Sequence, residues 1–242
     1  MSSFPEVYVG TSGWVYDWNP NGLKWYVRES GFNAVELNMS FYRFPYASFV
    51  RNWLRHGSQL RWSIKVHRSI THYSQLGKKA LSLWNRFRGI FKPMDDLIDF
   101  YLLQLPPSFR LTRENLRRLE TFSQSVNLGE RMAVEFRSPE WFTGNRGVEI
   151  CKRLGVTFVS TDSPEFGTIV DSSNNVVYMR LHGRITWYAY HYKREELVEI
   201  ALNILQLRPK RVFVFFNNNH DMLVNGREMK DILLSLREKI ND

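Results

Sequence analysis

The stretch Val177-Tyr178-Met179-Arg180-Leu181-His182-Gly183 has the composition of a buried β-strand whose C-terminal end carries polar groups. Because side chains alternate across a strand, Arg180 and His182 lie on one face, and Met179 and Leu181 lie on the opposite face. Burying two such polar groups side by side costs free energy unless they are paired or used. The stretch therefore predicts a buried strand with two functional polar side chains, Arg180 and His182, at its C-terminal end.

Polar residues with the same two-residue spacing close several other apolar runs. The pairs are Glu36 and Asn38, Lys65 and His67, Glu135 and Arg137, and Asn217 and Asn219, and Asp162 closes a further short run. A (β/α)₈ barrel collects the C-terminal ends of its strands at one mouth, where its active site lies. The repeated pattern predicts such a mouth, with the charged and histidine side chains gathered in it.

Apolar runs of strand length alternate with amphipathic segments of helix length. After a first strand beginning at Val7, strands are expected at 34–39, 60–66, 99–105, 132–136, 157–161, 176–181 and 211–216. Helices are expected between them, including one that Thr112 caps. The alternation favours parallel pairing, and it predicts a single α/β domain over residues 1–242 with a TIM (β/α)₈-type barrel fold. The link 162–175 lacks helical periodicity, so we expect one degenerate βα unit there.

Length and composition agree with one such domain. The chain has 242 residues, of which 43% are hydrophobic, and about 250 residues are typical of a (β/α)₈ domain. The one cysteine, Cys151, excludes an intrachain disulfide, which fits a reducing compartment. The first residues lack the pattern of a signal peptide, and no uncharged apolar run approaches about 18 residues. We therefore expect a cytoplasmic protein that does not enter the membrane.

Positive charge is concentrated in one third of the sequence. The formal net charge is +9, and residues 51–118 contain 14 Lys or Arg against 4 Asp or Glu. A basic segment on a near-neutral remainder suggests attraction to phosphate, nucleic acid or another polyanion. The alternative is a solvated basic surface without a specific ligand, which is equally compatible with the excess of Lys and Arg in residues 51–118.

Carboxylate and histidine side chains at the strand ends are the candidate catalytic groups. Glu36, Glu135, Asp162 and His182 could act as acid and base. With His67 they could also supply ligands for a divalent metal, which is a candidate cofactor whose identity the sequence leaves open. The alternative is ion pairing, so we expect the three carboxylates to form a mixed network with the nearby cations.

The candidate substrate-binding groups are cationic, amide and aromatic. Lys65, Arg137 and Arg180 would hold an anion, because Arg offers a planar fork and Lys a point charge. Trp187 and Tyr188 could stack on a ring or form a lid. Loops after the last two strands often bind phosphate in such barrels, and the remaining candidates at strand ends are Asn38, His67, Asn217 and Asn218.

With these residues in view, the chain resembles the DUF72 family, also called YecE-like proteins. The matching motifs lie at 10–14, 35–38, 41–42, 71–72, 104–107, 135–137 with Trp141, Asp162, 180–183, 187–188 and 216–218. The resemblance implies a TIM-barrel fold and no particular reaction. The segment 219–226 departs from the family's usual Gly/Ala-rich pattern, which leaves the role of that loop open.

Three functions are compatible with these residues. The first is an enzyme acting on a phosphorylated or other anionic substrate at the barrel mouth, with metal-assisted hydrolysis as one form of it. The alternative is a nucleic-acid-binding or nucleic-acid-processing protein that uses the basic 51–118 face and the aromatic residues after the seventh strand. The third is a binding module without chemistry. The sequence leaves the oligomeric state open.

Overall fold

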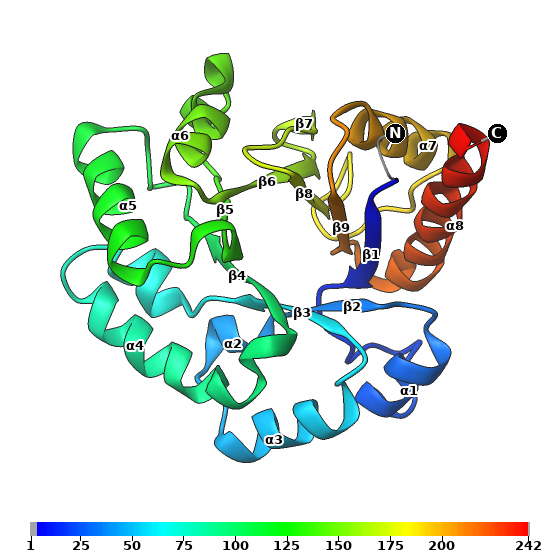
Figure 1. Cartoon of the computed structure of the whole chain (residues 1–242), viewed down its shortest axis with the longest axis horizontal. Helices are drawn as coiled ribbons and strands as arrows, with labels where there is room; N and C mark the ends of the chain where they lie inside the picture. Colours follow the sequence, from blue (N-terminus) through cyan, green and yellow to red (C-terminus); the bar gives the residue numbers. More distant parts are fainter. Residues whose placement is uncertain (1–3, 242) are drawn as a thin grey trace.

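The computed structural model describes residues 4–241, with side chains described for residues 4–236. Figure 1 shows a ring of helices around a set of central strands. The strands are β1 Glu6–Thr11, β2 Ala34–Leu37, β3 Arg61–Lys65, β4 Ile98–Gln104, β5 Met132–Glu135, β6 Thr157–Ser163, β7 Gly167–Ile169, β8 Val176–Leu181 and β9 Arg211–Phe216.

Seven of the helices in the described chain form the outer ring, and shorter helical turns lie in the loops. The α-helices are α1 Gly22–Glu29, α2 Met39–Tyr42, α3 Ala47–His56, α4 Ala80–Phe91, α5 Arg113–Val126, α6 Arg146–Leu154, α7 Arg194–Gln206 and α8 Met222–Asn241. The short turns are η1 Ser69–Tyr73, η2 Lys92–Leu97, η3 Gly129–Arg131, η4 Pro139–Trp141, η5 Thr143–Asn145 and η6 Asn219–Asp221. Only the four-residue α2 stands apart from the ring, directly after β2.

Eight parallel strands make a nearly closed barrel, which confirms the predicted fold class. The strands follow one another in the order β1-β9-β8-β6-β5-β4-β3-β2. Between β1 and β2 the hydrogen-bonded pairing reduces to a parallel bridge that joins Ser12 to Glu36. Gly10 is needed at this seam, because a Cβ atom there would overlap the backbone carbonyl of Ala34.

The unit between β6 and β8 has no helix, as the weak periodicity of 162–175 predicts. The chain turns back after β6 and forms the short strand β7, which pairs antiparallel with β6. A connection that contains Ser173 and Asn174 then leads into β8. The Ser173 hydroxyl accepts from the backbone N–H of Phe158 in β6 and donates to the carbonyl of Val156 just before it, and the Asn174 amide donates to the Thr157 hydroxyl. Hydrogen bonds from these polar side chains replace the packing that a helix supplies elsewhere.

The barrel interior has an apolar lower layer and a charged upper layer. The lower layer contains Ala34, Phe100, Ala133, Tyr178 and Phe213, which belong to one buried cluster. Two residues further along the same faces come Glu36, Glu135 and Arg180. Because residues two positions apart lie on the same face of a strand, the apolar and the charged side chains both point into the barrel interior.

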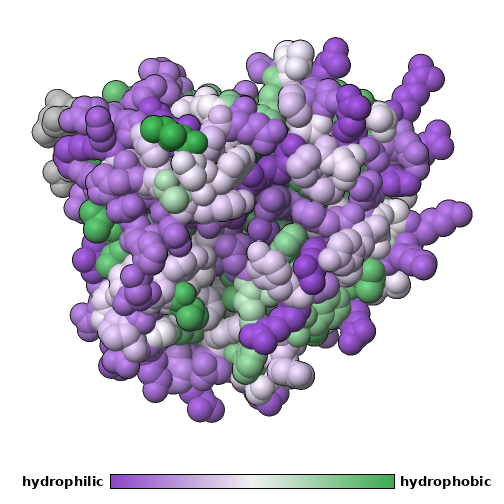
Figure 2. Space-filling model, turned by 180° about the vertical axis from the view of Figure 1, so that it is seen from behind, coloured by the Kyte–Doolittle hydropathy of each residue, from purple (hydrophilic) through white to green (hydrophobic). Residues whose placement is uncertain are grey.

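The outer faces of the strands pack against the helices and form the main core. Helix α5 begins as predicted at Thr112, whose hydroxyl accepts a hydrogen bond of 3.2 Å from the backbone N–H of Asn115. Helix α8 starts at Met222, directly after the short turn η6. On the face in Figure 2, hydrophilic residues predominate and apolar ones are scattered. Within residues 4–241 no helix is both long and apolar enough to cross a membrane.

Candidate active site at the barrel mouth

Arg180 is the centre of a buried charge network at the C-terminal ends of the strands. Its side chain is 0% exposed, and its Nε and Nη2 atoms donate to the two oxygens of Glu36 at 2.9 and 2.6 Å. Its Nη1 atom donates to Glu135. The hydroxyls of Ser12 and Tyr178 each donate to Glu36 at 2.7 Å. Both oxygens of Glu36 are therefore occupied by protein donors.

Glu135 joins Arg180 to a second arginine and a histidine. Its Oε1 atom lies 2.6 Å from Nη2 of Arg137 and 3.1 Å from Nε2 of His182. Burial acts to raise the pKa of Glu135, but Arg137 and Arg180 outweigh it and hold the pKa well below its ordinary value. Glu135 is therefore an ionised carboxylate at neutral pH.

His182 is neutral in this environment. Burial, followed by the charges of Arg137 and Arg180, lowers its pKa to about 3. Its Nδ1 atom lies 3.2 Å from Nδ2 of Asn217, and its Nε2 atom lies 3.1 Å from both Nη2 of Arg137 and Oε1 of Glu135. Arg137 and His182 are thus held by the same carboxylate oxygen, and the network gains no charge from the histidine.

Lys65 is the third cation at the mouth, and within the described chain it has no ion-pair or hydrogen-bond partner for its ammonium. It is the last residue of β3, is 8% exposed, and its Nζ atom lies 4.4 Å from the centre of the Phe41 ring. Burial, followed by the charge of Arg180, lowers its pKa to about 7. The carboxylates that would neutralise it are engaged by the two arginines.

Aromatic side chains from the loop after β8 cover Arg137 and His182. The guanidinium carbon of Arg137 lies 4.4 Å from the ring centre of Trp187. The rings of Trp187 and Tyr188 lie 5.4 and 5.7 Å from the ring of His182. The loop turns sharply, with φ values of 104° at Gly183 and 64° at Tyr188. This turn places both aromatic residues beside Arg137 and His182.

The expectation that Asp162 joins this network is wrong. Its side chain accepts hydrogen bonds from Thr168 at 2.9 Å and from Arg184 at 3.0 Å, outside the barrel interior. Alternation explains the difference, because Val159 of the same strand belongs to the inner cluster and a residue three positions later points to the opposite face. Two carboxylates, not three, therefore face the three cations of the mouth.

His67 also lies apart from the network. Strand β3 ends at Lys65, and the His67 ring packs 4.6 Å from Phe44 and hydrogen-bonds to Ser69. Since the strand alternation no longer applies beyond β3, His67 does not share the inward face of Lys65.

The asparagines divide between the mouth and its rim. Asn217 contacts His182, and Asn38 donates at 3.4 Å to the carbonyl of Ser12 while its own buried Oδ1 atom has no described partner. Asn218 points away and donates to Tyr190 and Asn225, which ties the loops after β8 and β9 together. Asn217 and Asn38 are thus near the network, whereas Asn218 has a structural position.

Several residues at the mouth are absent from the sequence-based candidates. Ser12 and Tyr178 donate hydrogen bonds to the Glu36 carboxyl group. Phe41 and His72 lie near Lys65. Tyr178 could have been found from the sequence, because it precedes Arg180 by two positions on the same face. The others come from the bridge after β1 and from the short helical segments α2 and η1, which are too short for a periodic pattern to indicate which way a side chain points.

The described residues do not favour a metal centre at the mouth. Within this part of the chain no group of three or more His, Cys, Asp or Glu side chains is arranged to hold an ion. The oxygens of Glu36 and Glu135 already accept hydrogen bonds from arginine, serine and tyrosine, and His182 lies beside Glu135. A metal would have to displace these donors.

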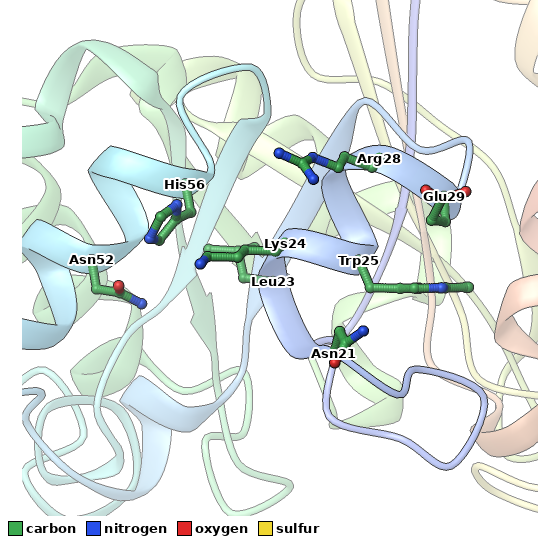
Figure 3. Close-up of a pocket in the computed structure, with 8 residues that line it drawn as sticks. All are labelled: Asn21, Leu23, Lys24, Trp25, Arg28, Glu29, Asn52 and His56. Carbon is green, nitrogen blue, oxygen red and sulfur yellow. The ribbon is translucent and has the colours of Figure 1, made fainter.

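A basic surface pocket lies away from the mouth, between α1 and α3. It has a volume of about 580 Å³ and is drawn in Figure 3, where Lys24 and Arg28 from α1 lie opposite His56 and Asn52 from α3. Arg55 lines the adjoining depression together with Lys24, Arg28 and His56. We call Lys24, Arg28, Arg55 and His56 the basic groove.

Comparison with known proteins assigns the family. The family model described as "Protein of unknown function DUF72" matches residues 8–239. The chain belongs to the DUF72 family. The resemblance seen in the sequence motifs is therefore confirmed, and with it the expected TIM-barrel fold.

Several relatives match this chain over nearly its whole length. The UPF0759 protein YunF of Bacillus subtilis is 26% identical, over 94% of each chain. The crystal structure of a DUF72 protein of Thermotoga maritima has a TM-score of 0.82 and 29% identity, covering 95% of this chain and 99% of that one. A DUF72 protein of Enterococcus faecalis has a TM-score of 0.82 at 21% identity, covering 94% and 95%.

Proposed function

We propose that the protein is an enzyme acting on a small anionic substrate, which binds at the C-terminal mouth of the barrel between Arg137 and Lys65. One observation carries the proposal: three cations, Arg137, Arg180 and Lys65, stand against two carboxylates, Glu36 and Glu135. A buried site with more positive than negative groups is stabilised by an anion, or by release of a proton.

Arg137 has a free edge with which to bind the anion. One of its terminal nitrogens donates to Glu135, while its Nε atom is buried and has no hydrogen-bond partner within the described residues. Buried N–H groups are rarely left unpaired, so a ligand or water atom is expected there. Trp187 covers the guanidinium face and excludes water from one side, which strengthens the attraction to an anion.

The roles of the remaining groups follow from their partners. Glu36, with both oxygens engaged and no exposure, holds Arg180 in place. Glu135 and His182 hold Arg137. The proposal involves no metal ion, because the carboxylate oxygens are already committed to protein donors.

Replacing Arg137 by glutamine should weaken binding of inorganic phosphate about 10- to 100-fold. The change removes a charge-assisted hydrogen bond, worth roughly 1.5–3 kcal/mol, and about 1.4 kcal/mol corresponds to a tenfold change in Kd. Isothermal titration calorimetry at low ionic strength measures the Kd for inorganic phosphate in the variant and in the unaltered protein. Arg146→Gln, at an exposed position, is the matched control and should bind phosphate as the unaltered protein does. Equal affinity in Arg137→Gln and Arg146→Gln would refute the proposal.

A second candidate, nucleic-acid binding, is supported by the basic groove. Burial and then the charges of Lys24, Arg55 and Arg28 lower the pKa of His56, which reflects the concentration of positive charge there. Trp25 lines the same pocket and is half-buried, so it could stack on a base. The groove includes part of the basic 51–118 segment.

If the groove binds polynucleotides, changing Lys24, Arg28 and Arg55 together to glutamine should reduce the salt dependence of binding. Each lost phosphate contact lowers the slope of log K against log salt by about 0.7–0.9. Fluorescence anisotropy with single- and double-stranded oligonucleotides measures the slope, with Arg146→Gln as control. An unchanged slope, or no binding of the unaltered protein at low salt, removes this candidate.

A further inference from the structure

We propose that the ε-amine of Lys65 is a nucleophile that forms a Schiff base with the carbonyl group of an anionic substrate. The inference rests on the proposed function, since Arg137 is taken to hold the anionic group of the same molecule. It adds a covalent step and narrows the substrate class to anionic aldehydes and ketones.

The position of Lys65 supports a reactive amine. The residue ends β3 at the mouth, and its backbone carbonyl accepts a hydrogen bond of 2.7 Å from the Ser40 hydroxyl, which fixes the strand end against α2. Its ammonium lies over the Phe41 ring and has no counterion within the described part of the chain. An unpaired buried lysine is the arrangement that favours the neutral, nucleophilic amine.

The surrounding charges act on the pKa of Lys65 in both directions. The groups that act on Lys65 are Arg180, Glu36, Glu135 and Arg137, contributed by β8, β2, β5 and the loop after β5, and Lys65 in turn acts on His72 from η1. The two glutamates favour the charged amine, but burial and the two arginines prevail and bring the pKa to about 7. His72, with a pKa lowered to about 4 mainly by burial, adds no positive charge at neutral pH.

The chemical step is balanced without an oxidant or a reductant. The nitrogen lone pair of the neutral amine forms a bond to the carbonyl carbon, and the π pair of the carbonyl moves to its oxygen. A proton passes from nitrogen to that oxygen through water and gives a carbinolamine. The hydroxyl group then leaves with a further proton as water, and the C=N bond forms. Protonation of this nitrogen restores a cation, which the anionic group held by Arg137 compensates.

Borohydride trapping tests the proposal. The full-length protein is incubated at pH 7 with glyoxylate or dihydroxyacetone phosphate and sodium cyanoborohydride, and the reduced adduct is located by peptide mass spectrometry. At this pH an amine of pKa about 7 has a neutral fraction on the order of 10³-fold larger than an ordinary lysine. We expect Lys65 to be labelled at least about 100-fold faster than the exposed Lys78, with a rate that rises through pH 7.

Two variants keep the result interpretable. Lys65→Met should lose the fast adduct while its circular dichroism spectrum stays that of the unaltered protein, and Lys78→Met should keep the adduct. Inorganic phosphate should slow labelling of Lys65 and leave that of the other lysines unchanged. Labelling of Lys65 no faster than that of Lys78 would overturn the inference.

The failure of the inference and the failure of the proposed function give different results. If phosphate binds in calorimetry and Arg137→Gln weakens it, but no adduct forms on Lys65, the mouth binds anions and the Schiff base is wrong. If Lys65 is labelled rapidly by the neutral aldehyde glyceraldehyde as well as by glyoxylate, and phosphate does not compete, the amine is reactive but the anion site is wrong.

Discussion

Replacing Arg180 by methionine is expected to lower the free energy of unfolding by about 3–5 kcal/mol. Arg180 is fully buried and donates to both Glu36 and Glu135, so its removal leaves the Glu36 carboxyl group in the barrel interior without its cation and with only two hydroxyl donors. Glu135 keeps Arg137 as a partner. For a chain of this size the loss corresponds to a fall in Tm of roughly 6–20 °C.

A double variant shows whether the loss of stability comes from leaving the buried Glu36 carboxyl group without its partner or from poorer packing of the methionine. Glu36→Gln combined with Arg180→Met removes both members of the pair. Ser12 and Tyr178 donate to different oxygens of Glu36, so the glutamine oxygen can accept from one hydroxyl while its amide N–H donates to the oxygen of the other. Replacing both partners of a buried pair is often neutral, whereas removing one is costly. Urea denaturation should therefore show the double variant to be more stable than Arg180→Met. If the double variant is the less stable of the two, burial of the unpaired charge is not the cause of the loss.

Replacing Lys65 by methionine is expected to stabilise the protein at pH 7 and below, by a few kcal/mol and at most about 5. Burial and Arg180 lower the pKa of Lys65 from 10.5 to about 7 in the folded state. Between these two values the unfolded chain binds more protons than the folded chain. The free energy of unfolding of the unaltered protein must therefore rise with pH in this window, with a slope of up to about 1.4 kcal/mol per pH unit.

The test is the difference between two curves of stability against pH. Lys65→Met lacks the titration, so its advantage should be largest below pH 7 and should shrink steadily towards pH 10. Groups that Lys65 does not influence titrate alike in both proteins and cancel, and His72, which it does influence, titrates near pH 4, below this window. Lys78→Met, at an exposed position, should give a curve parallel to that of the unaltered protein. A constant difference between Lys65→Met and the unaltered protein across the window would show that the Lys65 pKa is not lowered by folding.

Much of the barrel could be predicted from the sequence, because its signals are local. Strands β8 and β9 have the predicted limits, 176–181 and 211–216. The missing helix after β6 appears in the sequence as a lack of helical periodicity. The two-residue spacing correctly put Arg180 and His182 on one face at the C-terminal end of a strand.

The composition of the charged mouth required the tertiary structure. Glu36 and Arg180 are separated by 144 positions, and no local pattern says which carboxylate pairs with which arginine. Asp162 shows the limit most clearly. It closes an apolar run as Glu36 and Glu135 do, but the inward face of its strand is set by Val159, so Asp162 turns outward to Arg184.

The sequence alone determined the barrel and the end of the barrel at which polar groups gather, since both follow from the order and period of residues along the chain. The family was indicated separately, by the resemblance of its motifs to those of DUF72 proteins, and the family model confirmed it. Only the tertiary structure decided that two carboxylates meet three cations and that, among the residues it describes, the Arg137 Nε atom has no hydrogen-bond partner and the Lys65 ammonium lies over Phe41 with no counterion. These are properties of side chains brought together from separate strands. Their free energies depend on burial and on distances between residues far apart in the chain, which periodicity does not contain.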